Sequence, residues 1–130
     1  IFLLSIMSSI SKTNIQITIG ESVIEGEISK HLAPIIISQI IEKKRLSGPI
    51  VKIKDLLLYS PMGIVAGMHK PKKSFNKGDI GFLASSGAIV LFKKDQIVTN
   101  KMTHIGNLTG EIEKLEGIKP GEVFILEVLR

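Results

Sequence analysis

The sequence contains no cysteine and no tryptophan, and Tyr59 is its only tyrosine. Without cysteine the chain forms no disulfide, binds no metal through thiolates and has no thiol nucleophile. Aromatic residues make up 5% of the chain, which argues against binding single-stranded nucleic acid, because that binding needs several exposed rings for base stacking. The absence of cysteine suits a reducing compartment, and we predict a cytoplasmic location. The lysine- and isoleucine-rich composition is typical of heat-adapted proteins, which suggests an archaeal or thermophilic source.

Long apolar runs are also missing. The first seven residues, IFLLSIM, are too short to cross a bilayer, which takes about 20 residues, and they lack the flanking signals of a secretion peptide. We therefore predict no membrane association. Residues 1–12 are interpreted as an N-terminal extension, with Met7 as a candidate start. The extension is either disordered or an edge strand that pairs with a second copy in a homo-oligomer. Residues 13–130 form the single predicted domain.

Isoleucine, leucine and valine dominate the rest of the chain, mostly with the alternation of half-buried strands. One main α-helix is expected at about 32–45, with Pro34 in its first turn and Gly48-Pro49 ending it. A short helical turn is expected near 114–117. The expected strands are 14–20, 22–28, 50–54, 56–60, 64–68, 79–84, 88–93, 104–112 and 123–129. Short strands with frequent turn signals predict a mainly β protein with a closed or nearly closed barrel.

Four small residues, Ala84–Gly87, separate the apolar runs DIGFLA and AIVLF. Small residues let the backbone bend at the rim of a barrel, and barrel mouths are common ligand sites. The segment is therefore either a plain turn or a turn whose Ser85 and Ser86 contact a ligand. Residues 56–68 have a similar pair of interpretations. They either pack in the core before a turn, or form one wall of an apolar cleft through Tyr59 and Met62.

Motifs that would indicate catalysis or cofactor binding are incomplete. LASSG resembles a nucleophile elbow, but its first glycine is missing and a strand rather than a helix follows. No glycine-rich phosphate loop occurs. None of His31, His69 and His104 has a partner at metal-ligand spacing. The basic cluster HKPKKSFNK, residues 69–77, is interpreted as a solvated loop rather than a nucleic-acid site. We therefore predict no catalytic residues, no metal and no cofactor, and we do not expect nucleic acid as a partner.

The stretches KGDIGFLASSGAIVLF, IGNLTGEI and GIKPGEVFILEV resemble a family of small bacterial and archaeal cyclophilin-like proteins, mostly uncharacterised single domains. The motif residues are Gly78–Phe82, Ala88–Phe92, Asn107 and Gly110. The resemblance implies a cyclophilin-like closed barrel of eight strands. Cyclophilins catalyse prolyl isomerisation with an arginine that here corresponds to about Lys52, and lysine does not reproduce the forked donor geometry of a guanidinium.

The sequence thus favours a non-catalytic module that binds a small molecule or a peptide in a cleft. The alternative is a divergent peptidyl-prolyl isomerase in which Lys52 and the hydrophobic wall promote isomerisation weakly. The residues predicted to line the cleft are Lys52, Tyr59, Ser60, Met62, Phe82, Ser85, Ser86, His104 and Asn107.

Overall fold

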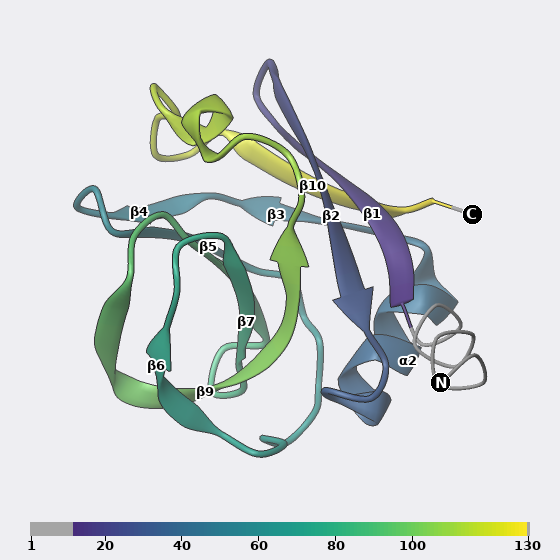
Figure 1. The fold of residues 1–130 in the computed structure, drawn as a ribbon. Coiled ribbons are helices and arrows are strands. Elements are labelled where there is room, and N and C mark those ends of the chain that lie inside the picture. The colour runs from purple at the N-terminus through teal and green to yellow at the C-terminus, as the bar shows by residue number, and fades with distance from the viewer. Residues whose placement is uncertain (1–11, 130) are drawn as a thin grey trace, which may run out of the picture.

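The structure is a computed structural model that describes residues 12–129, and within them the chain is mainly β (Figure 1). The helices of this described part are α2 (Pro34–Lys43) and the 3-10 helix η1 (Ile112–Leu115). The first strands are β1 (Lys12–Ile19), β2 (Ser22–Ser29), β3 (Arg45–Pro49), β4 (Val51–Ile53) and β5 (Leu57–Pro61). The remaining strands are β6 (Lys72–Phe75), β7 (Asp79–Leu83), β8 (Ala88–Phe92), β9 (Gln96–Leu108) and β10 (Val123–Val128).

All strand pairs are antiparallel, and the hydrogen-bonded path runs β3-β10-β1-β2-β9-β7-β8-β5-β4, with β6 pairing β9 outside it. Within residues 12–129 the sheet therefore has ten strands rather than eight, and its hydrogen bonding is open because β3 and β4 are the ends of the path. These end strands are consecutive in the chain, with only Ile50 between them. One stretch of backbone thus pairs first with β10 and then with β5, a division that sequence periodicity does not reveal.

The sheet curls around an inner core rich in isoleucine (Figure 1). Ile15, Ile17 and Ile19 alternate along β1 and are almost fully buried, as expected for a strand with one face on the core. From α2, Ile36, Ile37 and Ile40 join the same cluster. Burying each such side chain contributes about 1.5–3 kcal/mol, so these alternating isoleucines account for much of the stability of the sheet.

The main helix is shorter than the sequence suggested. It ends at Lys43 because Lys44 takes the left-handed conformation, with φ 65°, and donates its N–H to the Ile40 carbonyl at 3.0 Å. The prediction that Gly48-Pro49 ends the helix is wrong, because both residues lie in β3. Gly48 is required there by a close approach to β5. A Cβ at Gly48 would collide with the Pro61 carbonyl oxygen and lie 2.7 Å from Ser60 Oγ.

Four further elements differ from the expectation. Residues 64–68 form no strand and run as an irregular segment. Part of the presumed lysine loop is strand β6, which pairs with β9. Strand β9 begins at Gln96, eight residues before the predicted start at His104. The helical turn near the C-terminus is η1, two residues earlier than predicted. The strand β6 and the early start of β9 reflect their pairing with each other.

Two predictions concern the ends of the chain and the membrane. Within residues 12–129, none of the helices is long and apolar enough to cross a bilayer. Lys12, assigned above to the extension, is the first residue of β1. Residues 1–11 lie outside the described part of the chain, so their role as an extension that pairs with a second copy stays a prediction.

Candidate ligand-binding groove

A second, smaller hydrophobic cluster lies on the outer face of the sheet. Alternate residues of β5 and β8 point away from the inner core, and among them Leu57, Val90 and Phe92 pack with Phe75 of β6 and Met102 of β9. The strands β5 and β8 are therefore apolar on both faces, and their near-continuous hydrophobic sequences follow from this. An apolar outer face must be covered or must bind something.

The cover is an arm formed by β6 and the first part of β9, residues 96–102, which we call the β6–β9 arm. The rings of Phe75 and Phe92 stack with their centroids 4.3 Å apart and their planes 6° from parallel. The Gln96 side chain donates from Nε2 to the Leu56 carbonyl at 2.8 Å. These contacts fasten the base of the arm to the sheet.

The middle of the arm bulges. Ser74 lies opposite Ile97 and Lys72 lies opposite Met102, so residues 98–101 of β9 face a single residue of β6. An insertion of this kind bends the strand and removes it from regular pairing. The bulge leaves the apolar strands beneath the arm only partly covered.

The partly covered space is a groove of about 400 Å³, which we call the outer groove. Its floor comes from β4, β5, β7 and β8 and its wall from the β6–β9 arm. The lining is mainly apolar, and Tyr59 is its only titratable side chain. The floor residues are Ile53, Leu56, Leu57, Tyr59, Leu83 and Val90, and the wall residues are Met102 and those at 96–100.

The outer groove continues into a shallow basin of about 630 Å³. Leu83 and Asn100 line both, while Met68, Ala84, Ser85 and Lys101 line the basin alone. The turn at Ala84–Gly87 therefore does lie beside an open surface.

Gly87 fixes the position of this turn. Its φ is 62°, and a Cβ there would collide with the Ile64 carbonyl oxygen. The Gly87 carbonyl accepts a hydrogen bond from the Met62 N–H at 3.1 Å. Ser86, next to it, is exposed and lines a separate depression formed with residues 63–67. The small residues of the turn thus serve a close approach between two backbone segments.

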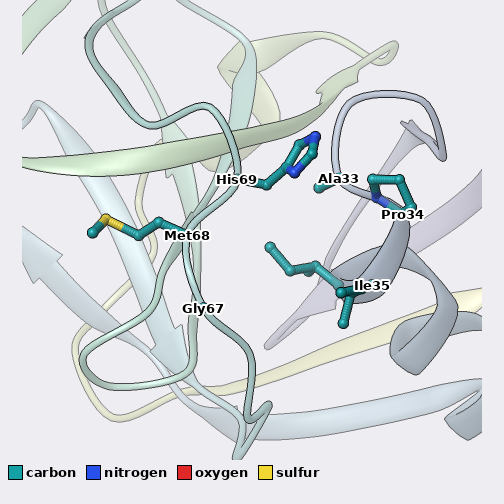
Figure 2. A pocket seen from close by; sticks show the side chains of 7 residues that line it. Ala33, Pro34, Ile35, Gly67, Met68 and His69 are labelled. Carbon is teal, nitrogen blue, oxygen red and sulfur yellow. The ribbon is translucent and has the colours of Figure 1, made fainter.

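A smaller cavity of about 270 Å³ lies between the start of α2 and the segment that precedes β6 (Figure 2). Ile35 and His69 extend from its two sides, whereas Met68 points away from it (Figure 2). Met68 also lines the basin, so this one side chain separates the two spaces. None of the nine predicted cleft residues lines this cavity.

The structure brings few of the predicted cleft residues together. Tyr59 lines the outer groove and Ser85 lines the basin beside it. Phe82 and Met62 belong instead to the inner core, and Ser60 is fully buried with no hydrogen-bond partner for Oγ among the described residues. Lys52 is exposed and lies opposite Leu58 in the β4–β5 pair. Because Leu58 faces the inner core and paired residues share a face, Lys52 lies on the opposite face from the groove.

His104 and Asn107 belong to a separate polar cluster around Asp79, which is 4% exposed. Asp79 accepts hydrogen bonds from Asn107 Nδ2 and from the Asn76 N–H, both at 2.8 Å. Asp79 and Asn107 also lie directly opposite each other in β7 and β9. These two residues of the sequence motif therefore hold the sheet together at this point rather than line the groove.

The ring of His104 is held beside this cluster. Its Nε2 donates to the Gly106 carbonyl at 2.8 Å and lies 3.6 Å from Asp79 Oδ1, and the ring meets Phe75 edge to face. Burial lowers the pKa of His104 below its usual value. The charge of Asp79 opposes this shift and the charge of Lys72 adds to it. The neutral imidazole is thus favoured in the folded protein.

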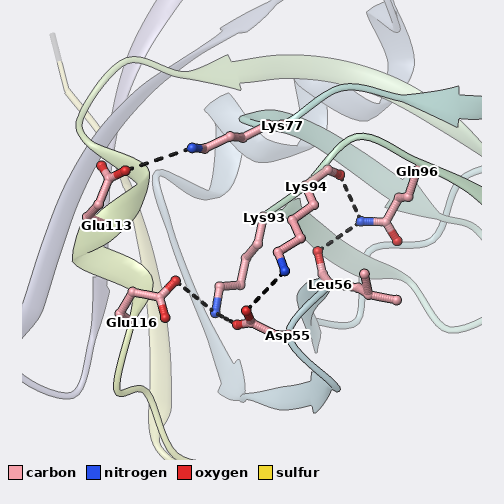
Figure 3. A network of polar contacts seen from close by, with 8 residues as sticks. All are labelled: Asp55, Leu56, Lys77, Lys93, Lys94, Gln96, Glu113 and Glu116. Carbon is pink, nitrogen blue, oxygen red and sulfur yellow. Dashed lines mark hydrogen bonds and ion pairs between the residues drawn. The ribbon is translucent and has the colours of Figure 1, made fainter.

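Another polar network fastens the end of β8 to η1 and to the β4–β5 turn (Figure 3). The Lys93 side chain is only 3% exposed, and its Nζ lies 2.6 Å from Asp55 Oδ1 and 3.4 Å from Glu116 Oε2. Burial disfavours the charged ammonium, but these two carboxylates outweigh it, so the pKa of Lys93 is raised. The hydrogen bond with Lys93 also lowers the pKa of Asp55. These charges are neutralised within the fold.

The outer groove offers mainly apolar contacts, together with Tyr59 and the polar side chains of Gln96, Thr99 and Asn100. Among residues 12–129 no three histidine or carboxylate side chains gather as a metal site would need. The groove residues that the sequence reasoning missed are chiefly the wall, residues 96–100. The sequence signal for this wall is weak, because the β-branched run Ile97-Val98-Thr99 favours a strand but polar and apolar residues do not alternate along it.

No protein-family model matches the chain, and no curated protein matches it. Among solved structures, the chain is similar to the solution structure of the hypothetical protein AF2241 from Archaeoglobus fulgidus. The TM-score is 0.75 at 17% identity, over 92% of this chain and 96% of that one. It is also similar to McbB in complex with tryptophan, with a TM-score of 0.67 at 12% identity, over 85% of this chain and 43% of McbB. At these identities the likeness shows a shared fold and nothing more.

Proposed function

We propose that the protein is a cyclophilin-like module that binds a small molecule or a peptide in the outer groove without covalent chemistry. The observation that carries this proposal is the bulge of residues 98–101, which leaves an apolar groove open on the outer face of the sheet. A groove of this size with an apolar lining and few polar groups is typical of small-ligand sites.

A cyclophilin-like arrangement of the curled sheet is part of the same proposal. Its support is that the two ends of the hydrogen-bonded path are joined in the chain by Ile50, and that Gly48 of β3 approaches Ser60 of β5 closely.

Binding is favoured over catalysis by what surrounds the groove. General acid–base chemistry needs a titratable group within hydrogen-bond reach of the reacting atoms, and Tyr59 is the only such group in the lining. Lys52, which the isomerase alternative required, is on the other face of β4. An isomerase would therefore have to act through the apolar groove alone.

The test is a titration followed by the amide signals of the isotopically labelled protein. The ligands are a panel of short proline-containing peptides and free amino acids, with tryptophan included because McbB was solved in complex with it. We expect a ligand to shift the signals of Ile53, Tyr59, Leu83 and Asn100 together. The Tyr59→Ala variant should weaken that binding about tenfold, because it removes the largest side chain of the floor.

The matched control is Val123→Ala, which truncates an exposed apolar residue of β10 and should leave the affinity unchanged. Signal changes confined to other parts of the molecule would refute the groove as the site. The same peptides serve to test isomerisation by exchange spectroscopy. Uncatalysed prolyl isomerisation takes tens to hundreds of seconds, so binding without acceleration would exclude the isomerase alternative.

A further inference from the structure

Charge is unevenly distributed along this chain. Residues 56–110 contain seven lysines and only two carboxylates, Asp79 and Asp95, whereas the rest of the chain contains ten basic and ten acidic residues. The whole net charge of +5 therefore belongs to the part that forms strands β5 to β9, which supply most of the outer groove.

Three of the seven lysines are already paired with carboxylates. Lys93 contacts Asp55 and Glu116, Lys94 Nζ lies 3.4 Å from Asp55, and Lys77 Nζ lies 3.8 Å from a Glu113 oxygen (Figure 3). Both carboxylates of the segment are occupied as well. Asp79 holds Asn107 and Asn76, and Asp95 accepts the Lys77 N–H at 2.7 Å.

The other four lysines have no ion pair within residues 12–129, and all are exposed. They are Lys70, Lys72, Lys73 and Lys101, which lie on the β6–β9 arm or on the segment leading into it. A contact across the arm brings this segment beside β9, because the His69 N–H donates to Thr103 Oγ1 at 2.9 Å. The unpaired cations therefore gather on one side of the molecule.

These cations border the outer groove and its basin. Lys101 lines the basin, which shares Leu83 and Asn100 with the groove. Lys72 lies opposite the wall residue Met102, with its ammonium 5.0 Å from the centre of the Phe75 ring.

The far end of the groove is basic as well. The floor residue Ile53 is followed by Lys54, which is exposed, has a positive φ of 49° and has no ion pair in the described chain. The carboxylate of Asp55 is nearby, but it is engaged by Lys93 and Lys94.

We propose, resting on the function proposed above, that the ligand of the outer groove is an acidic peptide segment. Its apolar side chain enters the groove and its carboxylates on either side face the lysines at the two ends. Positive potential around an apolar site speeds the encounter with such a ligand and disfavours basic segments. Exposed lysines contribute modestly to affinity, and their effect is screened by salt.

A nucleic acid is the other polyanion that lysines attract, but the surface does not suit one. Binding of single strands depends on exposed aromatic rings for base stacking. Of the aromatic residues at this surface, Phe75 and Phe92 are buried against each other, and only Tyr59 lines the groove. An apolar groove between two basic ends fits alternating acidic and apolar side chains better than a continuous phosphate backbone.

The experiment compares three capped hexapeptides that share a Leu-Phe centre and carry two glutamates, two serines or two lysines on each side. Binding to the full chain is measured by the groove amide signals at low and at moderate salt. We expect the glutamate peptide to bind about tenfold tighter than the serine peptide at low salt and the lysine peptide to bind weakest. The preference should shrink as salt rises.

Two double variants with the same change of charge serve as a matched pair. Lys73→Gln with Lys101→Gln removes two cations beside the groove. This double variant should weaken binding of the glutamate peptide about fivefold, with little effect on binding of the serine peptide. Lys114→Gln with Lys119→Gln removes two exposed cations from the region of η1 and should change neither affinity by more than twofold.

The outcomes separate the two proposals. Equal affinity for all three peptides at the groove would refute the acidic preference and leave the binding function in place. If neither the three peptides nor any ligand of the panel above shifts the amide signals of the groove residues, both the binding function and the acidic preference are refuted. A ten-nucleotide single strand of uridine that binds tighter than the glutamate peptide would overturn the acidic peptide in favour of nucleic acid.

Discussion

The inner and outer faces of β5 and β8 carry similar side chains but differ in how completely they are covered. On the inner face, Leu58 and Leu91 are fully buried in a cluster that spans the sheet and α2. On the outer face, Leu57 and Val90 belong to a small cluster under the β6–β9 arm and also line an open groove. Adjacent residues of one strand thus have different roles.

The comparison suggests why the groove can exist without weakening the fold. Because successive residues of a strand face opposite sides, the sheet can complete its inner core with one set of residues and use the other set for binding. The inner core supplies most of the hydrophobic stabilisation, so the outer face can remain partly open. Substitutions on the outer face are therefore expected to alter binding with only a small loss of folding stability.

Truncation of the two neighbouring leucines, Leu57 and Leu58, should give the largest difference between the two faces. Leu58→Ala leaves a cavity in the inner core and should lower the free energy of unfolding by about 4 kcal/mol. Leu57→Ala faces the groove, where the surroundings can relax and water can enter, and should cost about 1–2 kcal/mol. Chemical denaturation followed by circular dichroism measures both losses.

The two variants should rank in the opposite order when the loss of ligand affinity is measured instead of the loss of stability. Leu57→Ala removes part of the groove floor and is expected to weaken ligand binding. Leu58→Ala should bind the ligand with normal affinity at temperatures where it is folded. Equal losses of stability, or a binding defect in Leu58→Ala alone, would contradict the division of the two faces.

A second prediction concerns the arm that covers the outer face. Phe75→Ala removes the ring that stacks on Phe92 and should lower the free energy of unfolding by about 3 kcal/mol. Because few other side chains hold the arm, the loss should appear first as faster amide exchange at 96–102. Phe75→Leu keeps most of the volume and should cost about 1 kcal/mol, roughly the worth of the ring pair. Uniformly faster exchange through β1 and β2 would show that the arm is not a separate unit.

Sequence periodicity predicted the strands that have one face in the inner core. β1, β2, β7, β8 and β10 all begin or end within two residues of the expected positions, because alternation is a local signal. The helix and β3 were confused because RLSGP carries no pattern of its own, and its pairing with β10 is a tertiary contact. The irregular course of residues 64–68 likewise follows from packing of the buried Ile64 against the turn at Gly87.

The site was harder to predict than the fold. Placing a residue in a cleft requires knowing which face of its strand is outward, and a shift of one residue reverses that face. Phe82 and Ser60 were assigned to the cleft, but both point inward, whereas their neighbours Leu83 and Tyr59 line the groove. Asn107 was chosen for its motif, and its contact with Asp79 is structural.

The smallest expected effect is a change in the free energy of unfolding with pH, and it depends on a histidine on the outer side of β9, next to the arm. His104 has a pKa lowered from 6.5 by burial, with Lys72 adding to the shift and Asp79 opposing it. As the pH falls below about 6.5, the unfolded chain takes up a proton that the folded protein still excludes. The free energy of unfolding should therefore decline, and the decline should stop once the pH lies below the folded pKa, where both states are protonated.

His104→Gln should flatten this part of the stability profile, because no proton uptake remains at that position. His69→Gln is the matched control, since it keeps His104 and should keep the decline. Denaturation midpoints at several pH values between 4 and 8 measure the three profiles. If protonation of His104 loosens the arm through its edge contact with Phe75, amide exchange at 96–102 should rise over the same pH range and stay constant in His104→Gln. A decline that persists unchanged in His104→Gln would assign it to other groups and separate the arm from this histidine.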